Sequence, residues 1–250
     1  MQDKVIVITG ASAGIGAAFA RLASTSGAKV ALVARRKAEL DAVRDACGNN
    51  ALAVVADVSK RSEVERVVAE TIARFGGIDV WINNVGQGIS RNPSELTDED
   101  IDAVMQVNVK SALYGMQSVL PHFKSRKSGH IINISSMLGR TPFAVIRSAY
   151  CGAKHFLNAL TATMRSEIQA THPGIQVSLV SPGVVRTDFG LNAMHGGPDS
   201  RSFPGSQSAE EVADVLAYVV NTRKSDVYTR VGAKNGVTDY LDKLTEDPVR

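Results

Sequence analysis

The sequence predicts a doubly wound α/β domain, and three observations support that prediction. Short runs of β-branched and apolar residues alternate with longer amphipathic segments along most of the chain. The runs are apolar at nearly every position, which is typical of strands buried on both faces of a parallel sheet. Glycines come directly after the first run and before a helical pattern. Alternation of this kind favours right-handed crossovers, with helices on both faces of the sheet.

The expected strands are short and regularly spaced. They cover residues 4–9, 29–34, 51–56, 78–83, 130–135 and 176–181, with a weaker strand at 226–229. Two of the helical patterns between them begin with an N-cap hydroxyl followed three residues later by an acid, which is the spacing of a capping box. These pairs are Thr97 with Asp100 and Ser208 with Glu211. We expect the first pair to open one long helical segment, residues 97–124.

Composition indicates a single domain over residues 1–250, with no internal repeat. A hydrophobic content of 44% and this length are enough to bury a large core without disulfides or metals. The net charge of +3 is modest and its Lys and Arg residues are dispersed, which argues against a nucleic-acid partner. No apolar run has transmembrane length, and Cys47 and Cys151 lack metal or redox spacing. We therefore expect free thiols, no bound metal, no membrane association and a cytoplasmic protein.

One segment departs from the strand–helix alternation. Residues 187–207 are rich in glycine and carry scattered Phe, Leu and Met with no helix or strand period. A loop this long inside a compact domain is usually functional or disordered. Open α/β sheets bind ligands at the carboxyl ends of their strands, and this segment follows such an end. We therefore expect residues 187–207 to form a substrate lid.

The turn after the first strand is predicted to hold a phosphate. Gly10, Gly14 and Gly16 allow the backbone to approach a ligand closely. A helix that begins near Ile15 would aim its free N–H groups and its positive dipole end at the same point. Ser12 can add a hydroxyl hydrogen bond. The position of these glycines between a strand and a helix indicates a dinucleotide site rather than an ordinary turn.

The end of the second strand predicts which dinucleotide is bound. An NAD site has Asp or Glu about here, to bond the adenosine ribose. This chain has Ala34, followed by Arg35 and Arg36. Two guanidinium groups and no acid suit a ribose 2′-phosphate, so we expect NADP(H). The alternative is that both arginines are only surface charges at the start of the next helix.

Several motifs occur together in a recognisable order. They are TGASAGIG at 9–16, DV at 57–58, NNVG at 83–86, Asn108, SS at 135–136, Tyr150-x-x-x-Lys154 and SPGVVRT at 181–187. This set, from Val5 to about Tyr228, resembles the single-domain branch of the short-chain dehydrogenase/reductase family. Each motif alone is weak evidence, but their common register is specific. The resemblance implies a Rossmann-type fold with a seven-stranded parallel sheet, and a homodimer or homotetramer.

The resemblance also implies roles for individual residues. The implied cofactor contacts are Asp57 and Val58 near the adenine, Asn83 and Gly86 in the central crevice beside the adenosine ribose, and Pro182, Gly183 and Thr187 beside the nicotinamide. The implied catalytic tetrad is Asn108, Ser136, Tyr150 and Lys154. Within it, Tyr150 and Lys154 also contact the cofactor, and Asn108 anchors a water that links Lys154 to solvent.

The spacing of Tyr150 and Lys154 suits proton transfer. Reducing a carbonyl requires a hydride from the cofactor and a proton for the developing alkoxide, from a group whose pKa lies near the working pH. A free tyrosine has a pKa of about 10. Residues i and i+4 share one face of a helix, so we expect the Lys154 ammonium to lower the pKa of Tyr150 toward neutral. Ser136 would donate a hydrogen bond to the substrate oxygen and steady the alkoxide.

Three positions depart from the family pattern. Ser136 is fourteen residues before Tyr150, where the family usually has thirteen, so Ser135 and Ser148 remain alternatives for the catalytic serine. Val85 replaces the usual alanine of the NNVG motif. The chain also lacks the glycine-rich C-terminal close of many acyl-carrier-protein ketoreductases, which argues against a role in fatty-acid elongation.

The leading expectation is an NADPH-dependent carbonyl reductase or alcohol dehydrogenase that acts on an apolar small molecule. The candidate pocket residues are apolar and could equally pack in the core: Met137, Leu138, Phe143, Val145, Ile146, Phe189, Leu191 and Met194. A phosphorylated sugar or a polycarboxylate would need more basic residues than this region shows, although four arginines leave some room: Arg140, Arg147, Arg186 and Arg201. The alternative from another class is a catalytically silent dinucleotide-binding sensor or scaffold. Dehydratases and epimerases of the longer family branch carry an added C-terminal domain. The 250 residues leave no room for it, so we do not expect either activity.

Overall fold

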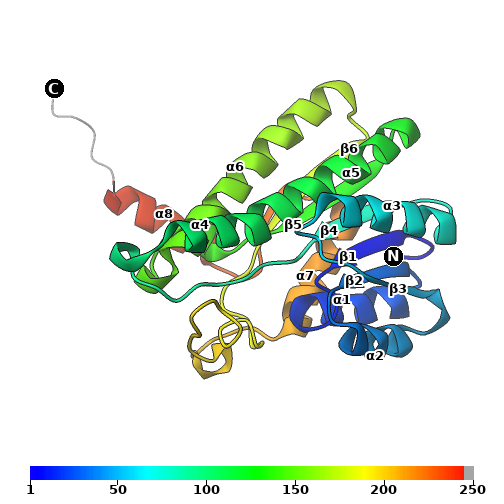
Figure 1. The fold of residues 1–250 in the computed structure, drawn as a ribbon. Coiled ribbons are helices and arrows are strands. Elements are labelled where there is room, and N and C mark those ends of the chain that lie inside the picture. The colour runs from blue at the N-terminus through cyan, green and yellow to red at the C-terminus, as the bar shows by residue number, and fades with distance from the viewer. Residues whose placement is uncertain (245–250) are drawn as a thin grey trace.

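The computed structural model describes residues 1–244, and its central feature is one parallel seven-stranded sheet (Figure 1). The strands are β1 Val5–Thr9, β2 Lys29–Ala34, β3 Ala51–Val55, β4 Val80–Asn83, β5 Gly129–Ile134, β6 Ile175–Ser181 and β7 Asp226–Tyr228. Their order is β3-β2-β1-β4-β5-β6-β7, which reverses direction between β1 and β4. All seven expected strands are confirmed, with ends displaced by no more than two residues.

Helices cover both faces of the sheet, as predicted (Figure 1). They are α1 Gly14–Thr25, α2 Lys37–Cys47, α3 Arg61–Phe75, α4 Asp98–Met105, α5 Ser111–Arg126, α6 Ser148–Thr171, α7 Ala209–Thr222 and α8 Ala233–Leu244. One face packs on α1, α2 and α7, and the other on α3, α5 and α6. No helix within residues 1–244 combines the length and the apolar character needed to cross a bilayer.

Alternation along the strands produces two separate cores. Ile6 and Ile8 of β1 pack with the layer of α1, α2 and α7, whereas Val7 between them packs with α3 and α5 on the opposite face. Successive side chains of a strand point to opposite faces, so a strand buried on both sides must be apolar throughout. This is why the expected strands could be recognised as continuous apolar runs.

The segment between β4 and β5 differs from the single helix expected at 97–124. The Thr97–Asp100 capping box is present and opens α4, but residues Gln106–Lys110 form a turn of π-helix before α5 begins. Asn108 lies in this turn, and its Nδ2 donates to the Val104 carbonyl at 2.9 Å. In an α-helix that carbonyl would accept from the backbone N–H of Asn108 itself. The side chain therefore covers a carbonyl that a wider turn would otherwise leave open.

Residues 187–207 form an irregular segment that projects from the sheet between the α4–α6 side and the α1–α7 side (yellow to gold in Figure 1). It contains one short 3₁₀ turn, Ser200–Ser202. Isolated bridges join Met194 to Ile89 and Gln207 to Val185. The segment is thus tied to the loop after β4 and to the chain after β6, both at the carboxyl edge of the sheet.

Candidate active site

The glycine turn after β1 has the geometry of an anion cradle. Gly10 and Gly14 have φ of +67° and +54°, a region that favours glycine, and a Cβ on Gly16 would lie 2.4 Å from the Gly10 carbonyl oxygen. Helix α1 begins at Gly14, one residue before the predicted start at Ile15. Its N-cap residue Ala13 makes no side-chain capping bond, and its first turn has no acid. The first N–H groups of α1 are therefore free to meet a phosphate.

Asn84, which the sequence did not single out, holds this turn in place. Its side-chain Nδ2 donates to the carbonyls of Thr9 at 3.0 Å and Gly10 at 3.3 Å, and its backbone N–H donates to Thr9 Oγ1 at 2.9 Å. The turn after β1 is thereby fastened to the end of β4. The signal in the sequence was the second Asn of the NNVG motif, since a residue just past the strand end faces the crevice between β1 and β4.

The neighbouring Asn83 faces the other way. Its Oδ1 accepts from Trp81 Nε1 at 2.7 Å, and its Nδ2 donates to Asn133 Oδ1 at 2.8 Å and to the Ala112 carbonyl at 3.2 Å. The side chain is buried and fully occupied by these bonds. Asn83 therefore shapes the crevice only by holding β4 to β5 and α5, and any contact with a cofactor is left to its backbone.

The end of β2 brings together residues that are distant in the sequence. Arg36 Nη2 donates to Ser12 Oγ at 3.2 Å, so the arginine pair and the glycine turn lie side by side. The other terminal nitrogen of Arg36 faces Glu39 at 3.2 Å, and both side chains are about half exposed. Ala34, at the strand end, is buried. The Arg36 guanidinium thus stands at the open edge of the cradle, whereas Arg35 is exposed and its charge acts on Asp57 after β3.

The DV pair at the end of β3 is mostly occupied by the protein itself. Burial raises the pKa of Asp57, but hydrogen bonds from the Ser59 hydroxyl and backbone N–H, helped by the Arg35 charge, leave that pKa below its usual value. Val58 is only 6% exposed and packs in the core with Val64. Little of Val58 is left to meet a ligand.

Two further predicted cofactor residues lie where the sequence placed them, at the carboxyl edge. A Cβ on Gly14 would stand 3.2 Å from Cγ2 of Thr187, so Thr187 lies across the glycine turn. A Cβ on Gly86 would stand 3.1 Å from Asn108 Oδ1 and 3.4 Å from Lys154 Nζ. Gly86 therefore gives space beside the predicted tetrad. This space lies between the tetrad and the crevice that is predicted to hold the cofactor.

Pro182 and Gly183 follow β6 and form one wall of the same edge. The Pro182 carbonyl accepts from the Met137 backbone N–H at 2.8 Å, which fixes the turn that follows Ser136. Gly183 lies against the side chain of Arg230, whose Cδ would be 3.0 Å from an added Cβ. Backbone rather than side chain faces the site at both positions.

Among the candidate serines, the structure brings Ser136 to Tyr150. The Ser136 hydroxyl lies close enough to Tyr150 to act on the pKa of its phenol, which it lowers, and Ser136 Oγ accepts from the Leu138 N–H at 3.1 Å. Ser135 is instead bonded to Asn158 at 2.5 Å, on the far side of the strand end. The hydroxyl of Ser148 is buried and has no partner among the described residues. The extra residue in the loop before Tyr150 therefore leaves the Ser136–Tyr150 pair intact.

Lys154 is buried beneath Tyr150 and faces the end of β5. Its Nζ donates to the Ile134 carbonyl at 2.9 Å and lies 5.7 Å from the centroid of the Tyr150 ring. Burial lowers the pKa of Lys154 to about 8. Asn108 is also buried, and its Oδ1 accepts from the Gln87 N–H at 3.1 Å while its Nδ2 donates to the Gln87 carbonyl at 3.0 Å.

The prediction that Lys154 lowers the pKa of Tyr150 is wrong for this structure. Burial raises the pKa of Tyr150 to about 12, against the opposing effects of the Ser136 hydrogen bond and the Arg147 charge. The ammonium lies near the ring and is engaged by a carbonyl, so loss of water around the phenol dominates. Tyr150 is consequently a protonated phenol at neutral pH, which is the form able to donate a proton.

The apolar pocket candidates divide into two groups. Leu138, Phe189 and Met194 belong to the cluster around Tyr150, and the rings of Phe189 and Tyr150 are 5.5 Å apart. Met137 is partly buried, and the other four are exposed: Phe143, Val145, Ile146 and Leu191. Phe143 packs edge-to-face against Tyr240 of α8, at 5.1 Å. Residues 187–207 thus cover Tyr150 through Phe189 and Met194.

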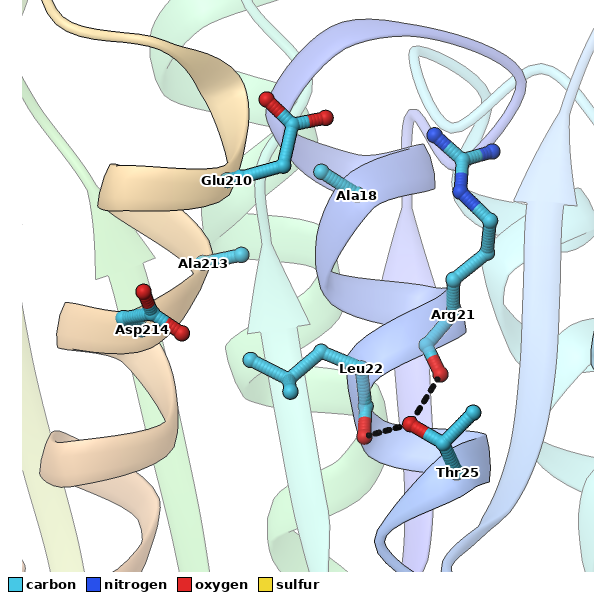
Figure 2. Close-up of a pocket in the computed structure, with 7 residues that line it drawn as sticks. All are labelled: Ala18, Arg21, Leu22, Thr25, Glu210, Ala213 and Asp214. Atoms are coloured by element: carbon cyan, nitrogen blue, oxygen red, sulfur yellow. Dashed lines mark hydrogen bonds between the residues drawn. The ribbon is translucent and has the colours of Figure 1, made fainter.

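A surface hollow lies between α1 and α7, away from the predicted site residues (Figure 2). It is lined by Ala18, Arg21, Leu22, Thr25, Glu210, Ala213 and Asp214. Thr25 in this hollow bonds the carbonyls of Arg21 and Leu22 within its own helix, each at 3.0 Å. None of the predicted site residues lines it. We interpret it as the groove left where two packed helices meet.

Comparison with known proteins identifies the class. The chain matches the family model for short chain dehydrogenase over residues 4–195. It therefore belongs to the short-chain dehydrogenase/reductase family, a family of oxidoreductases with this parallel sheet.

Three individual proteins show how similar this chain is to known members of the family. An uncharacterized oxidoreductase of Staphylococcus saprophyticus is 37% identical over 190 residues, which is 76% of this chain and 77% of that protein. A crystal structure of 3-ketoacyl-(acyl-carrier-protein) reductase from Brucella melitensis, complexed with NADH, has a TM-score of 0.81 at 27% identity and covers 91% of this chain and 98% of its own. An alcohol dehydrogenase of Thermococcus sibiricus, complexed with 5-hydroxy-NADP, has a TM-score of 0.78 at 26% identity and covers 91% and 96%.

Proposed function

We propose that this protein is an NADP(H)-dependent oxidoreductase that transfers a hydride between nicotinamide and a carbonyl or secondary alcohol of a small molecule. The observation that carries the proposal is the buried Ser136–Tyr150 pair with Lys154 beneath it, at the same sheet edge as the glycine turn. Structural neighbours named as a ketoacyl reductase and an alcohol dehydrogenase, both in complex with nicotinamide dinucleotides, support it. The bound cofactor would supply or accept the hydride.

The residues of the chain would divide the remaining work. Ser136 would donate a hydrogen bond to the substrate carbonyl and stabilise negative charge as it develops there. Tyr150, kept protonated by burial, would deliver its proton to that oxygen. Lys154, whose Nζ bonds the Ile134 carbonyl at the end of β5, would hold the cofactor with its remaining N–H donors. Asn108 holds the loop at Gln87 against Gly86 and keeps this space open.

The choice of NADP(H) follows from the charges at the cradle. The N-terminus of α1, with Thr187 across from Gly14, would hold the diphosphate. Arg35, Arg36 and Ser12 would receive the ribose 2′-phosphate, since two guanidinium donors and a hydroxyl match its oxygens. Ala34 offers no acid for a bare ribose. Glu39 beside Arg36 weakens that charge only partly, because both groups are half exposed.

The experiment that tests the function is NADPH consumption by wild type and Tyr150→Phe with a panel of ketones, aldehydes and diketones. Loss of the proton donor should lower kcat by about 10²- to 10⁴-fold. NADPH affinity should stay unchanged, because the ring remains. Tyr240→Phe is the matched control, since this tyrosine packs on Phe143 outside the tetrad and should keep full activity.

Two other outcomes would sink parts of the proposal. Turnover that survives in Tyr150→Phe would contradict proton transfer at this residue. Tight NADPH binding by wild type with no turnover on any panel member would favour the alternative of a silent dinucleotide-binding sensor.

We further propose that residues 1–250 act as one catalytic domain with residues 187–207 as the substrate lid. Phe189 and Met194 of this segment pack around Tyr150, so a substrate could reach the phenol only if they move. We also propose a cytoplasmic location, because Cys47 and Cys151 are buried, unpaired thiols.

A further inference from the structure

Four arginines near the active site differ in whether their charge is compensated. Three have acidic partners: Arg140 pairs with Asp226, Arg186 with Glu211, and Arg201 with Asp188 and Asp199. Within residues 1–244, Arg147 has no carboxylate within ion-pair distance, and its one hydrogen bond runs from Nη1 to the Ile89 carbonyl at 3.1 Å. An uncompensated cation this close to a catalytic tyrosine needs an explanation.

Arg147 lies in the wall around Tyr150. It comes three residues before Tyr150 and is half-buried. A Cβ on Gly88 would stand 2.6 Å from Arg147 Nη1 and 3.2 Å from Cε1 of Phe189, so the guanidinium and the ring edge border the same point. The Phe189 ring in turn packs against Tyr150. The positive charge therefore belongs to the cluster that a substrate must enter.

A second polar group faces the same place from another element. A Cβ on Gly197 would stand 2.8 Å from Arg147 Nη2 and 2.9 Å from Ser90 Oγ. The Ser90 hydroxyl is buried and has no partner among the described residues. The Gly190 carbonyl oxygen borders the same point, 2.7 Å from that Cβ, but neither side chain has a carboxylate partner among the described residues. Buried polar groups are normally hydrogen-bonded, so an unpartnered hydroxyl beside a guanidinium that lacks an anion suggests that a ligand supplies one. Burial also lowers the pKa of Arg147, as expected for a charge short of both water and an anion.

We propose that Arg147 and Ser90 bind a carboxylate of the substrate, so that the natural substrate is an oxo acid, or the matching hydroxy acid in the reverse direction. One guanidinium and one hydroxyl suit a single negative charge; a phosphate dianion would call for more cations. The apolar side chains of Leu138, Phe189 and Met194 would hold the carbon chain between the two ends. The inference rests on the proposed function and replaces the apolar substrate expected from the sequence by an amphipathic one.

The reaction balances without any further reactant. Hydride from the reduced nicotinamide forms a bond to the carbonyl carbon, and the π pair moves to oxygen. That oxygen takes the proton of Tyr150, which is later restored from solvent. The carboxylate is unchanged and serves only to bind and orient, which leaves the chemistry of the tetrad as proposed.

The test compares straight-chain oxo acids, with increasing numbers of carbons between ketone and carboxylate, against their methyl esters. We expect wild type to prefer one oxo acid over its ester by about 100-fold in kcat/KM, because the ester leaves the buried Arg147 unpaired. Arg147→Met should raise the KM for that acid by at least about tenfold and remove the preference for the acid over its ester. Ser90→Ala should weaken the preference less.

Arg201→Met is the matched control. Arg201 lies in the 187–207 segment, but Asp188 and Asp199 already compensate its charge. It should therefore keep the wild-type preference for the acid. Thermal melting of each variant checks that the fold survives.

Three results would overturn the proposal or separate it from the proposed function. If wild type reduces ester and acid equally well, no carboxylate site exists. If Arg147→Met loses both substrates equally, Arg147 only supports the loop at Ile89. If wild type reduces neither, the proposed function fails, and calorimetric titration of the NADPH-bound protein with the oxo acids decides the site separately. Binding that Arg147→Met abolishes would then support it, and binding that is absent or unchanged would refute it.

Discussion

At the scale of single residues, we propose that two side chains, Arg35 and Arg36, decide the choice of cofactor. Replacing Arg35 and Arg36 together by alanine should weaken NADPH binding by at least about tenfold, since each guanidinium would otherwise bond the 2′-phosphate. NADH affinity should barely change, because it has no phosphate at that position. Titration of each cofactor by fluorescence measures both effects.

Arg44→Ala gives a control for general charge effects. Arg44 also lies on α2, but it pairs with Asp41 and Asp45 away from the glycine turn. It should leave both affinities unchanged. An equal loss of NADPH and NADH binding in the Arg35/Arg36 variant would show that these arginines support the fold instead.

At the scale of elements, helix α4 and residues 187–207 are joined by one buried carboxylate. Asp100 Oδ1 accepts from His195 Nε2 at 2.7 Å, and its Oδ2 accepts from Arg91 at 2.7 Å and from the Thr97 N–H at 3.2 Å. The hydrogen bond with His195, together with those from Arg91 and Thr97, lowers the pKa of Asp100 to about 2, although burial opposes this. A carboxyl with a depressed pKa stabilises the folded protein above its ordinary pKa and loses that contribution as the pH falls toward 2.

We predict that Asp100→Asn loosens the 187–207 segment. The substitution keeps an oxygen for the capping bond but removes the charge that holds His195 and Arg91. Amide hydrogen exchange in residues 188–196 should become faster at neutral pH, whereas the wild type should show the same loosening only in acid. Mass spectrometry of peptides after exchange measures both.

The Thr97→Ala variant tests the N-cap of α4 separately from the hydrogen bond between Asp100 and His195. It removes the N-cap hydroxyl of α4, at a cost of about 1 kcal/mol in the free energy of unfolding, and leaves the His195 contact in place. Exchange in residues 188–196 should then stay near the wild-type rate. Equal acceleration in both variants would mean that Asp100 acts only through its helix.

At the scale of the whole molecule, the family usually assembles through the helices that follow the fourth and fifth strands. Ile101 on α4 is 41% exposed and Phe156 on α6 is 52% exposed, and both are apolar. We therefore predict a homodimer or homotetramer, because an interface would bury such side chains. Light scattering at working concentration should give at least twice the mass of one chain, and Phe156→Glu should reduce it. A monomeric wild type would refute the prediction.

The features that the sequence predicted are those set by local physics. The strands of the two cores were recognisable because a strand covered on both faces is apolar throughout. The glycine turn was recognisable because positive φ and close approach require glycine at Gly10, Gly14 and Gly16. Helical spacing put Tyr150 and Lys154 on one face, and the common register of the other motifs singled them out as a pair. The long helical segment at 97–124 was recognisable too, but the π turn within it at Asn108 was not, and there the Asn108 side chain bonds Gln87 of another loop.

Only the tertiary structure decided where a side chain points, which groups it bonds and how deeply it is buried. Two adjacent asparagines look alike in the sequence, yet Asn84 ties the glycine turn and Asn83 is turned toward β5 and α5. Spacing suggested that Lys154 would make Tyr150 more acidic, but burial makes it less so, since desolvation depends on everything packed around the phenol. Nothing in the sequence distinguished Arg147 from the other three arginines near the site. In the fold those three pair with acids, whereas Arg147 has no acidic partner within residues 1–244. The sequence by itself determined the family and the strands and predicted the reacting groups. The fold decided how these groups are buried and which arginine has no acidic partner among the described residues, because those properties arise between segments far apart in the chain.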